Sequence, residues 1–299
     1  MGEERSIICR NIVEESMSPI LSFCYLNGDY SSSLVSNPLE SAITTLDQAS
    51  NLLPAGAYTT FRTYSKYFAL HLNDHLRRLE TSSKLGGHPI RLNVDQLRRN
   101  LRVALTQFPG TEARVRLIIP FGLGDETIYI HVGALSVPTA AQRANGVKTL
   151  TAQMQRNNPS AKLSNFIQTS QAARRRLQEG FEEILMVDER GNILEGLTSN
   201  FYAVMGGEIW TAGQGVLSGI TRQIVLLLAE DAGYPVQLEA PKLSNLISFT
   251  EAFITSTSRA VLPVTEIDHE PVGDGKPGPL TQMLMHLYNQ KVLSEIEPI

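Results

Sequence analysis

The sequence is poor in several features that mark specialised classes of protein. It contains only two cysteines, Cys9 and Cys24, too few for a disulfide framework or a four-thiolate zinc site, so both are expected to be reduced thiols. No apolar run approaches the ~20 residues that a membrane-spanning helix needs. The net charge of -4 predicts no basic surface of the kind that binds nucleic acid. Neither membranes nor nucleic acids are therefore expected among its partners.

The beginning of the sequence also lacks a targeting feature. Its first sixteen residues, MGEERSIICRNIVEES, are acidic and have no long apolar core like that of a secretory signal. A cytoplasmic location is expected.

Motifs for several common site types are missing as well. The chain has no GxxxxGK[ST], so no nucleoside-triphosphate cradle is indicated, and HExxH, GxSxG and Ser-x-x-Lys are absent. His71 and His75 have the i, i+4 spacing of two metal ligands on one helix face, but no acidic or thiol partner accompanies them. A solvated or capping role is expected for this pair, and no metal site is predicted.

The first half of the chain predicts a mixture of strands and helices. β-Branched and aromatic residues favour strands, and leucines at three- and four-residue spacing favour helices. The expected strands are 57–64, 113–122 and 126–135, and the expected helices run from Asn73 to Gly86 and through Leu97, Leu101 and Leu105. No element is predicted before residue 57, where the pattern is irregular.

The second half is denser in turn signals. Strands are expected at 147–152, 182–188, 193–196 and in NFYAVM, EIWTA, EAFITST and AVLPVTEID, and helices at 166–178, 221–233 and 280–293. This order lacks the regular strand–helix–strand alternation of a doubly wound sheet, so the predicted fold class is α+β.

The junction between the halves predicts a domain boundary. Residues 136–146 are mostly small and polar and show no apolar period, which is typical of a linker. We therefore expect a small N-terminal α/β domain over 1–135, an interdomain loop over 136–146 and a large C-terminal domain over 147–299. A loop in that place is expected to cover a site between the domains.

Four short segments of the second half carry candidate site residues. Lys162 lies between a strand and a helix, and a hairpin carrying EGLTSN follows 33 residues later. LSGITR then begins the helix predicted at 221–233, and ITSTS ends a strand.

Together these segments have the parts that a pyridoxal 5'-phosphate site requires. That cofactor needs a lysine for covalent attachment, an acid to keep its ring nitrogen protonated and donors for a dianionic phosphate. Backbone N–H groups at a helix N-terminus suit the phosphate because both the dipole and the unpaired donors point at it. Gly219 allows close approach of the backbone. Each element alone is a weak signal, but the set in this order indicates such a site.

The order Lys…EGxxSN…GITR…TST resembles the class IV aminotransferases, the fold-type IV pyridoxal-phosphate enzymes, over about residues 55–290. The resemblance implies a small α/β domain and a larger pseudo-barrel domain with the cofactor between them, in a homodimer. Lys162 would be the Schiff-base lysine and the general base, Glu195 would pair with the pyridinium nitrogen, and Arg78 in HLRRL would bind the phosphate. The implied cofactor-binding residues are Arg78, Lys162, Glu195, Ser199, Asn200, Gly219, Ile220, Thr221 and Thr257.

Within this family the sequence is closest in pattern to the branched-chain aminotransferases. TSTSRAVLPVTEID followed by GDGKPGP resembles their C-terminal motifs, and YTTFR occupies the place of their strand motif bearing an arginine. The expected reaction exchanges an amino group between an aliphatic, branched-chain L-amino acid and 2-oxoglutarate. Arg62 is expected to bind the substrate carboxylate, with Arg116 as the other candidate, whereas Arg114 is expected to form a surface ion pair. The substrate-binding residues expected are Tyr58, Thr60, Arg62, Arg116 and Ser258.

The sequence departs from the branched-chain pattern in two places. Tyr58-Thr59-Thr60 stands where those enzymes have Phe-Glu-Gly, and Phe166 stands where they have a tyrosine that hydrogen-bonds the cofactor. Both departures concern the substrate more than the cofactor chemistry. Three alternatives stay open: an aminodeoxychorismate lyase that eliminates pyruvate, a D-amino-acid or amine transaminase of the same fold, and a non-catalytic binding protein.

Overall fold

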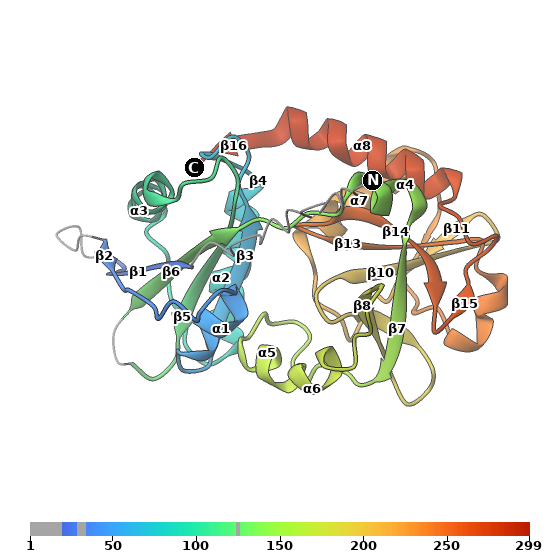
Figure 1. Ribbon diagram of the computed structural model, residues 1–299, viewed down its shortest axis with the longest axis horizontal. Helices are drawn as coiled ribbons and strands as arrows, with labels where there is room; N and C mark the ends of the chain where they lie inside the picture. The colour runs from blue at the N-terminus through green and yellow to red at the C-terminus, as the bar shows by residue number, and fades with distance from the viewer. Residues whose placement is uncertain (1–19, 29–33, 124–125) are drawn as a thin grey trace, which may run out of the picture.

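In the computed structural model, which describes residues 20–28, 34–123 and 126–299, the strands form two main sheets (Figure 1). The first sheet is antiparallel and has the order β2-β1-β6-β5-β3. Its strands are β1 (Leu21–Leu26), β2 (Val35–Ser36), β3 (Gly56–Arg62), β5 (Ala113–Pro120) and β6 (Thr127–Ala134).

Two helices cover one face of this sheet. They are α2 (Leu72–Leu85) and α3 (Val94–Gln107), and the predicted leucine stripes on both are buried in one core with Phe61, Val115 and Leu117 of the strands. Because side chains alternate along a strand, Tyr58, Thr60 and Arg116 lie on the opposite face. The face left free of these helices is the one that carries the predicted site residues.

The second sheet closes into a barrel of six strands. Along the sheet the order is β10-β13-β14-β7-β8-β9, and β9 pairs again with β10 through Glu195 and Asn200. β7 is parallel to β8 and to β14, and the other pairings in the ring are antiparallel. These strands are β7 (Val147–Gln153), β8 (Phe181–Val187), β9 (Ile193–Gly196), β10 (Asn200–Met205), β13 (Glu251–Ser256) and β14 (Ala260–Ile267). The α+β class and the expected pseudo-barrel are confirmed.

Short strands and two long helices complete this part. β11 (Glu208–Trp210) and β12 (Val236–Gln237) extend the sheet beyond β10, and β15 (Glu270–Pro271) pairs with β14. The helices α7 (Ile220–Asp231) and α8 (Pro279–Glu295) pack together in a core that includes Ile224 and Leu284. Both helices were predicted from their apolar periods.

One local prediction is wrong, and one element was not predicted. The single helix expected at 166–178 is two short ones, α5 (Asn165–Thr169) and α6 (Gln171–Arg174), which meet at Ser170. The Ser170 hydroxyl donates to the carbonyl of Ile167, a side-chain bond that competes with regular helix geometry. The 3₁₀ helix η1 (Leu243–Ser248) was not expected at all.

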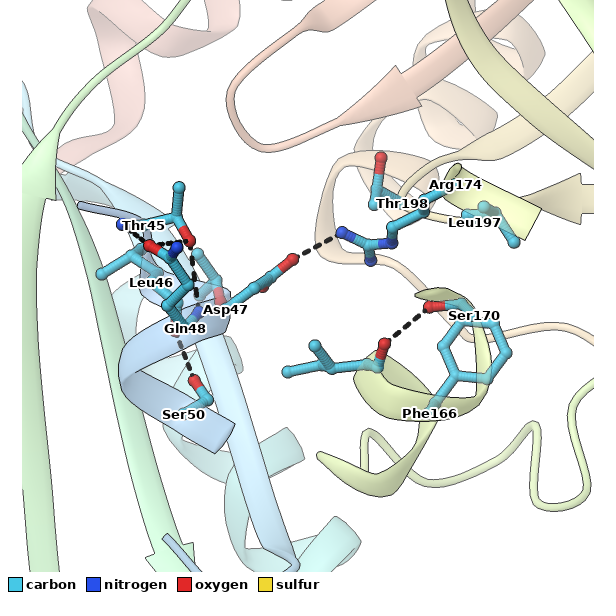
Figure 2. Close-up of polar contacts among 12 residues, drawn as sticks. Thr45, Leu46, Asp47, Gln48, Ser50, Phe166, Ser170, Arg174, Leu197 and Thr198 are labelled. Atoms are coloured by element: carbon cyan, nitrogen blue, oxygen red, sulfur yellow. Dashed lines mark hydrogen bonds and ion pairs between the residues drawn. The ribbon is translucent and has the colours of Figure 1, made fainter. Parts of the chain in front are cut away.

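The stretch before residue 57 was predicted to be irregular, and this is also wrong. It contains β1, β2 and the helix α1 (Leu46–Asn51). Thr45 caps α1, and the Gln48 side chain bonds back to the Thr45 backbone, so the pair forms a capping box (Figure 2). That T-x-x-Q signal was present in the sequence. Cys24 of β1 is a free, half-buried thiol, and Cys9 and the expected absence of a signal segment lie outside the described residues.

The end of the chain returns from the barrel to the first sheet. In Figure 1, α8 runs across the top of the molecule and ends beside β16. β16 (Ile296–Pro298) pairs with β4 (Phe68–Leu70), and Ile299 is buried in the first core. The last residues of the predicted C-terminal domain therefore pack against the N-terminal one.

The two histidines with metal-ligand spacing have different surroundings. His71, the N-cap of α2, bonds Asp74 and Glu295 across 2.8 and 2.7 Å. His75 is buried, so the solvated role expected for it is wrong. Within the part of the chain that the structure describes, no cluster of His, Cys, Asp and Glu could hold a metal ion. No helix among those residues has the length and apolarity to cross a membrane.

His131 on β6 makes stability depend on acidity. Its ring nitrogens lack hydrogen-bond partners among the described residues, and burial followed by the charge of Arg116 lowers its pKa to about 4 from 6.5. Between pH 6.5 and 4 the His131 ring is protonated in the unfolded chain but neutral in the folded one. The free energy of unfolding therefore falls as the pH drops from 6.5 towards 4, by about 3 kcal/mol at this residue. Urea unfolding at a series of pH values should show this loss, reduced in His131→Phe. An equal loss in His131→Phe, or an equal reduction in the control variant of the exposed His286, His286→Asn, would contradict the assignment.

Candidate active site

Residues of the first sheet and of the barrel line one cavity of about 480 Å³. Backbone and side chains from β3, β5, β9, β10 and the N-terminus of α7 all reach it. The predicted site residues that line it are Tyr58, Thr60, Arg78, Arg116, Lys162, Glu195, Ser199, Asn200, Gly219, Ile220, Thr221, Thr257 and Ser258. Of the whole predicted set, the structure leaves only Arg62 outside.

Hydrogen bonds from its backbone attach the loop of Lys162 to α2 and to the first sheet. Its N–H donates to the Ser82 hydroxyl over 3.0 Å, and its carbonyl accepts from the Tyr58 N–H over 3.0 Å. The Ser164 N–H donates to the Gly56 carbonyl over 2.8 Å. The loop thus bridges barrel and sheet, and the lysine Nζ lies 4.8 Å from the centre of the Tyr58 ring.

The environment of Lys162 favours the neutral amine. Burial has the largest effect, and the positive charges of Arg78, Arg156 and Arg116 follow; together they lower the pKa of the Lys162 amine well below its usual range. A neutral lysine amine is a nucleophile and can accept a proton. The side chain is therefore prepared for both steps that the sequence analysis assigned to it.

Three groups hold the buried Glu195 carboxylate. Arg156 Nε donates to Oε1 over 2.6 Å, and the Asn200 side-chain amide and the Leu217 N–H each donate to Oε2 over 3.2 Å. Burial raises the pKa of this carboxyl, and the charge and hydrogen bond of Arg156 act against the rise. The carboxylate faces the cavity with its orientation determined from three directions.

Arg156 was not identified from the sequence. It lies in a polar turn after β7 with no motif around it. Its guanidinium carbon lies 3.7 Å from the centre of the Phe166 ring, and its Nη2 donates to the Leu197 carbonyl over 3.3 Å. The phenyl ring that replaces the family's tyrosine thus packs against the partner of Glu195.

The start of α7 and Arg78 form an anion-binding end of the cavity. Gly219 is the N-cap of α7, and a Cβ built there would lie 2.4 Å from Asn200 Oδ1, so a side chain has no room. The first amides of α7 face this end, where Thr221 and Thr257 also contribute hydroxyls. The residues present therefore fit a phosphate group.

A buried chain of hydrogen bonds orients Arg78. Its Nη2 donates to the Thr59 hydroxyl over 3.1 Å, and that hydroxyl lies 3.1 Å from His75 Nδ1. Burial lowers the pKa of Arg78 to about 10, so the guanidinium stays charged at neutral pH, and its Nε lacks a partner among the described residues. A half-buried cation whose buried Nε has no acceptor is a further indication of an anionic ligand at this end.

The part of the cavity lining that comes from β5, α1 and α6 is rich in arginine. Arg116 Nη1 forms an ion pair with Asp47 over 2.8 Å, and its Nε donates to the Thr60 hydroxyl over 3.1 Å. Asp47 also pairs with Arg174 of α6, a contact between α1 and the segment after Lys162 (Figure 2). Neither this acid nor Arg174 was identified from the sequence.

Arg62 and Arg114 lie in surroundings that differ from those expected. Arg62 pairs with Glu112 over 2.7 Å, stacks on Tyr64 and does not line the cavity, so the carboxylate-binding role expected for it is not supported. Arg114 was expected to form a surface ion pair, yet it lines the cavity and has no ion pair among the described residues. Arg62 is at the end of β3, where the chain turns away from the site.

A third group of charged residues borders the cavity on the barrel side. Arg259 Nε pairs with Glu182 over 2.8 Å, and its Nη1 donates to the Thr198 hydroxyl over 2.8 Å. Glu183 accepts from Thr198 and Ser199 and thereby holds the turn between β9 and β10. These contacts give Thr198 and Ser199 of EGLTSN a structural role in the turn.

Removal of Arg156 should destabilise the protein strongly. Arg156→Gln leaves Glu195 buried without its cationic partner, and breaking a buried pair costs about 3–5 kcal/mol. Urea unfolding should show this loss, whereas the exposed Arg175→Gln should change little. The double variant Arg156→Gln/Glu195→Gln should lose less than Arg156→Gln alone because no uncompensated charge remains. An equal loss in the single and double variants would argue against the pair as the source of stability.

Comparison with known proteins gives a family. The model of the family described as "Amino-transferase class IV" matches residues 56–267. A D-alanine aminotransferase of Bacillus licheniformis is 29% identical over 255 residues, 80% of this chain and 88% of that protein. The branched-chain-amino-acid aminotransferase of Pseudomonas aeruginosa is 26% identical over 245 residues, 76% of this chain and 79% of its own.

Solved structures show the same fold. A branched-chain amino acid aminotransferase of T.th., crystallised with pyridoxamine 5'-phosphate, has a TM-score of 0.74 at 22% identity and covers 92% of this chain and 98% of its own. The branched-chain aminotransferase of Thermoproteus uzoniensis, crystallised with norvaline, has a TM-score of 0.71 at 23% identity. The match covers 93% of this chain and 99% of that one. With the family match spanning well over half of the chain and a cavity that fits the cofactor, this protein belongs to the class IV aminotransferases and is a pyridoxal-phosphate-dependent aminotransferase.

Proposed function

We propose that the protein transfers the amino group of an aliphatic, branched-chain L-amino acid to 2-oxoglutarate. The observation that carries the proposal is one cavity lined by Lys162, whose amine has a pKa well below its usual range, by the N-terminus of α7 and by several arginines. The cations lining it are Arg78, Arg114, Arg116, Lys162, Arg174 and Arg259, against the acids Asp47, Glu182 and Glu195. This surplus of positive charge favours an anionic acceptor such as a dicarboxylate.

The proposed roles at the cofactor follow the positions of the side chains. Arg78, Thr257 and the amides of Ile220 and Thr221 would hold the phosphate, and Glu195 would face the ring nitrogen, whose protonated form a carboxylate favours. Ser199 would hold the turn between β9 and β10 through Glu183, and Asn200 would orient the carboxylate of Glu195. When bound, pyridoxal phosphate supplies an electron sink for the carbanion formed at the substrate Cα.

Lys162 carries the proton chemistry of the proposed reaction. Its amine would hold the cofactor covalently until the substrate amine takes its place. The released amine, kept neutral by burial and by the surrounding arginines, would then accept the proton from the substrate Cα and donate it to the neighbouring cofactor carbon. The second half of the reaction reverses these steps with the acceptor.

The segment between the sheets would exclude water from the reaction. Ser136, Val137, Pro138, Thr139 and Gln142 line the cavity, and Thr139 caps the short helix α4 (Ala140–Asn145) through a capping box with Gln142. We propose that the first sheet and the barrel correspond to the two domains expected at 1–135 and 147–299, joined by this segment. A cytoplasmic homodimer completes the proposal, with light scattering as the test of the dimer.

A D-amino-acid substrate is the second candidate. The similarity to a D-alanine aminotransferase extends over 80% of this chain, and Tyr58-Thr59-Thr60 departs from the branched-chain motif. The same side chains would carry out the reaction, but the substrate would be the D-enantiomer of the amino acid.

Spectra of the purified holoenzyme distinguish these candidates. L-leucine, D-alanine and a primary amine are added separately, and the change in cofactor absorbance is followed, then reversed with 2-oxoglutarate. Faster conversion with L-leucine and recovery with 2-oxoglutarate are expected. Preference for D-alanine would favour the second candidate, and pyruvate formation from aminodeoxychorismate without any acceptor would indicate the lyase. A protein that binds the cofactor but converts no donor would be non-catalytic.

Lys162→Ala should lower the rate of amino transfer by several orders of magnitude while the fold is retained. Both the covalent attachment and the base at the substrate Cα are lost. Single-turnover kinetics with L-leucine measure the effect, and circular dichroism checks the fold. Lys84→Ala, which changes an exposed lysine of α2, serves as the control. Near-normal turnover in Lys162→Ala would contradict the assignment of this site.

Arg78→Ala and Thr257→Ala should weaken cofactor binding more than they slow proton transfer in cofactor-saturated enzyme. Each removes a contact to the phosphate, and a hydrogen bond to a charged group is worth about 1.5–3 kcal/mol. Equilibrium dialysis of the cofactor measures the change. Arg77→Ala is the matched control, because the Arg77 side chain is 74% exposed. Unchanged cofactor affinity in both variants would mean that the phosphate binds elsewhere.

A further inference from the structure

The cations that line the cavity differ in how their charges are compensated. Arg116 and Arg174 share Asp47, and Arg259 pairs with Glu182 and Glu183. Arg78 and Lys162 lie at the end proposed for the cofactor. Arg114 remains: its Nε is buried without a hydrogen-bond partner among the described residues, and Asp47 acts on it through charge without a described ion pair.

The position of Arg114 directs it to the substrate end of the cavity. On β5 it is two residues from Arg116, so both side chains project from the same face of the strand. Its Nε is buried without a partner, and burial, followed by the neighbouring charge of Arg116, lowers its pKa to about 10. The guanidinium is still charged at neutral pH. A half-buried guanidinium of this kind is unfavourable unless an anion balances its charge.

Arg116 is already occupied. Its Nη1 donates to the Ser50 hydroxyl over 2.8 Å and to the Leu46 carbonyl over 3.1 Å, in addition to the ion pair with Asp47. Both acceptors belong to α1, whose capping box places Asp47 in the first turn. α1 therefore neutralises Arg116 and holds it in one orientation.

We propose that Arg114 is the residue that binds a substrate carboxylate, and that Asp47 withdraws Arg116 from this task. The proposal deepens the proposed aminotransferase function and rests on it. A free guanidinium presents paired N–H donors that match the two oxygens of a carboxylate, which accounts for an arginine that the protein itself leaves without an acid. The carboxylate is either the α-carboxylate or the distal one of a dicarboxylate.

Unreactive carboxylates test this without turnover. Calorimetry on the holoenzyme measures the Kd of 4-methylvalerate, which has one carboxylate, and of glutarate, which has two. Arg114→Gln should raise the Kd about tenfold to a hundredfold, and Arg114→Lys, which keeps the charge but not the paired donors, should fall between. Weaker binding of both probes identifies the α-carboxylate, and weaker binding of glutarate alone identifies the distal one.

Arg62→Gln is the matched control because Arg62 is the register partner of Arg114 on β3 but lies outside the cavity. Its Kd values should equal those of the wild type. Unchanged Kd values in Arg114→Gln, or an equal rise in Arg62→Gln, would overturn the role of Arg114. Because the probes are not converted, this result is separate from the proposed function, which fails if the wild type transfers no amino group from L-leucine to 2-oxoglutarate.

Asp47→Asn tests the second part of the proposal. With the carboxylate gone, Arg116 regains an uncompensated charge beside Arg114, so Asp47→Asn should bind glutarate more tightly than the wild type. For the same reason Arg114→Gln/Asp47→Asn should recover part of the affinity that Arg114→Gln loses. A double variant that binds no better than Arg114→Gln would show that Asp47 does not withhold Arg116.

Discussion

The ion pair between Arg156 and Glu195 is the contact on which the arrangement of the site depends. A buried carboxylate has to be compensated, and here its two oxygens take donors from three segments: the turn after β7, strand β10 and the loop before α7. The ring of six strands closes at the Glu195–Asn200 pair. Closure of the barrel, the direction of Glu195 and the position of the α7 N-terminus are therefore set by the same few atoms.

The excess of positive charge around the cavity has two consequences. After burial, which has the largest effect, it lowers the pKa of the Lys162 amine further, since another cation beside Arg78, Arg156 and Arg116 is unfavourable. It also leaves the two ends of the cavity in need of anions. The anion of the cofactor and that of the substrate are thus part of the charge balance of the folded protein, and Asp47 supplies only part of that balance from within the chain.

The expected elements and the observed ones differ mainly where local signals are weak. The periodic helices α2, α3, α7 and α8 were predicted because one apolar face is repeated over several turns. The early helix α1 was missed because it is short, although its capping box is visible in the sequence. The break at Ser170 could not be read from the pattern, because a single side-chain bond divides the helix there.

The residues proposed to bind the cofactor could be selected before the fold was known, because Lys162, EGLTSN and GITR are local motifs, and the structure brings them to one cavity. The purpose of each arginine could not be identified in this way. Arg62, Arg114 and Arg116 lie on one face of the first sheet, yet the acids that pair with Arg62 and Arg116, Glu112 and Asp47, come from other segments. Charge compensation is a property of distances between segments, so only the folded chain could show that Arg114 is the one left without a partner among the described residues.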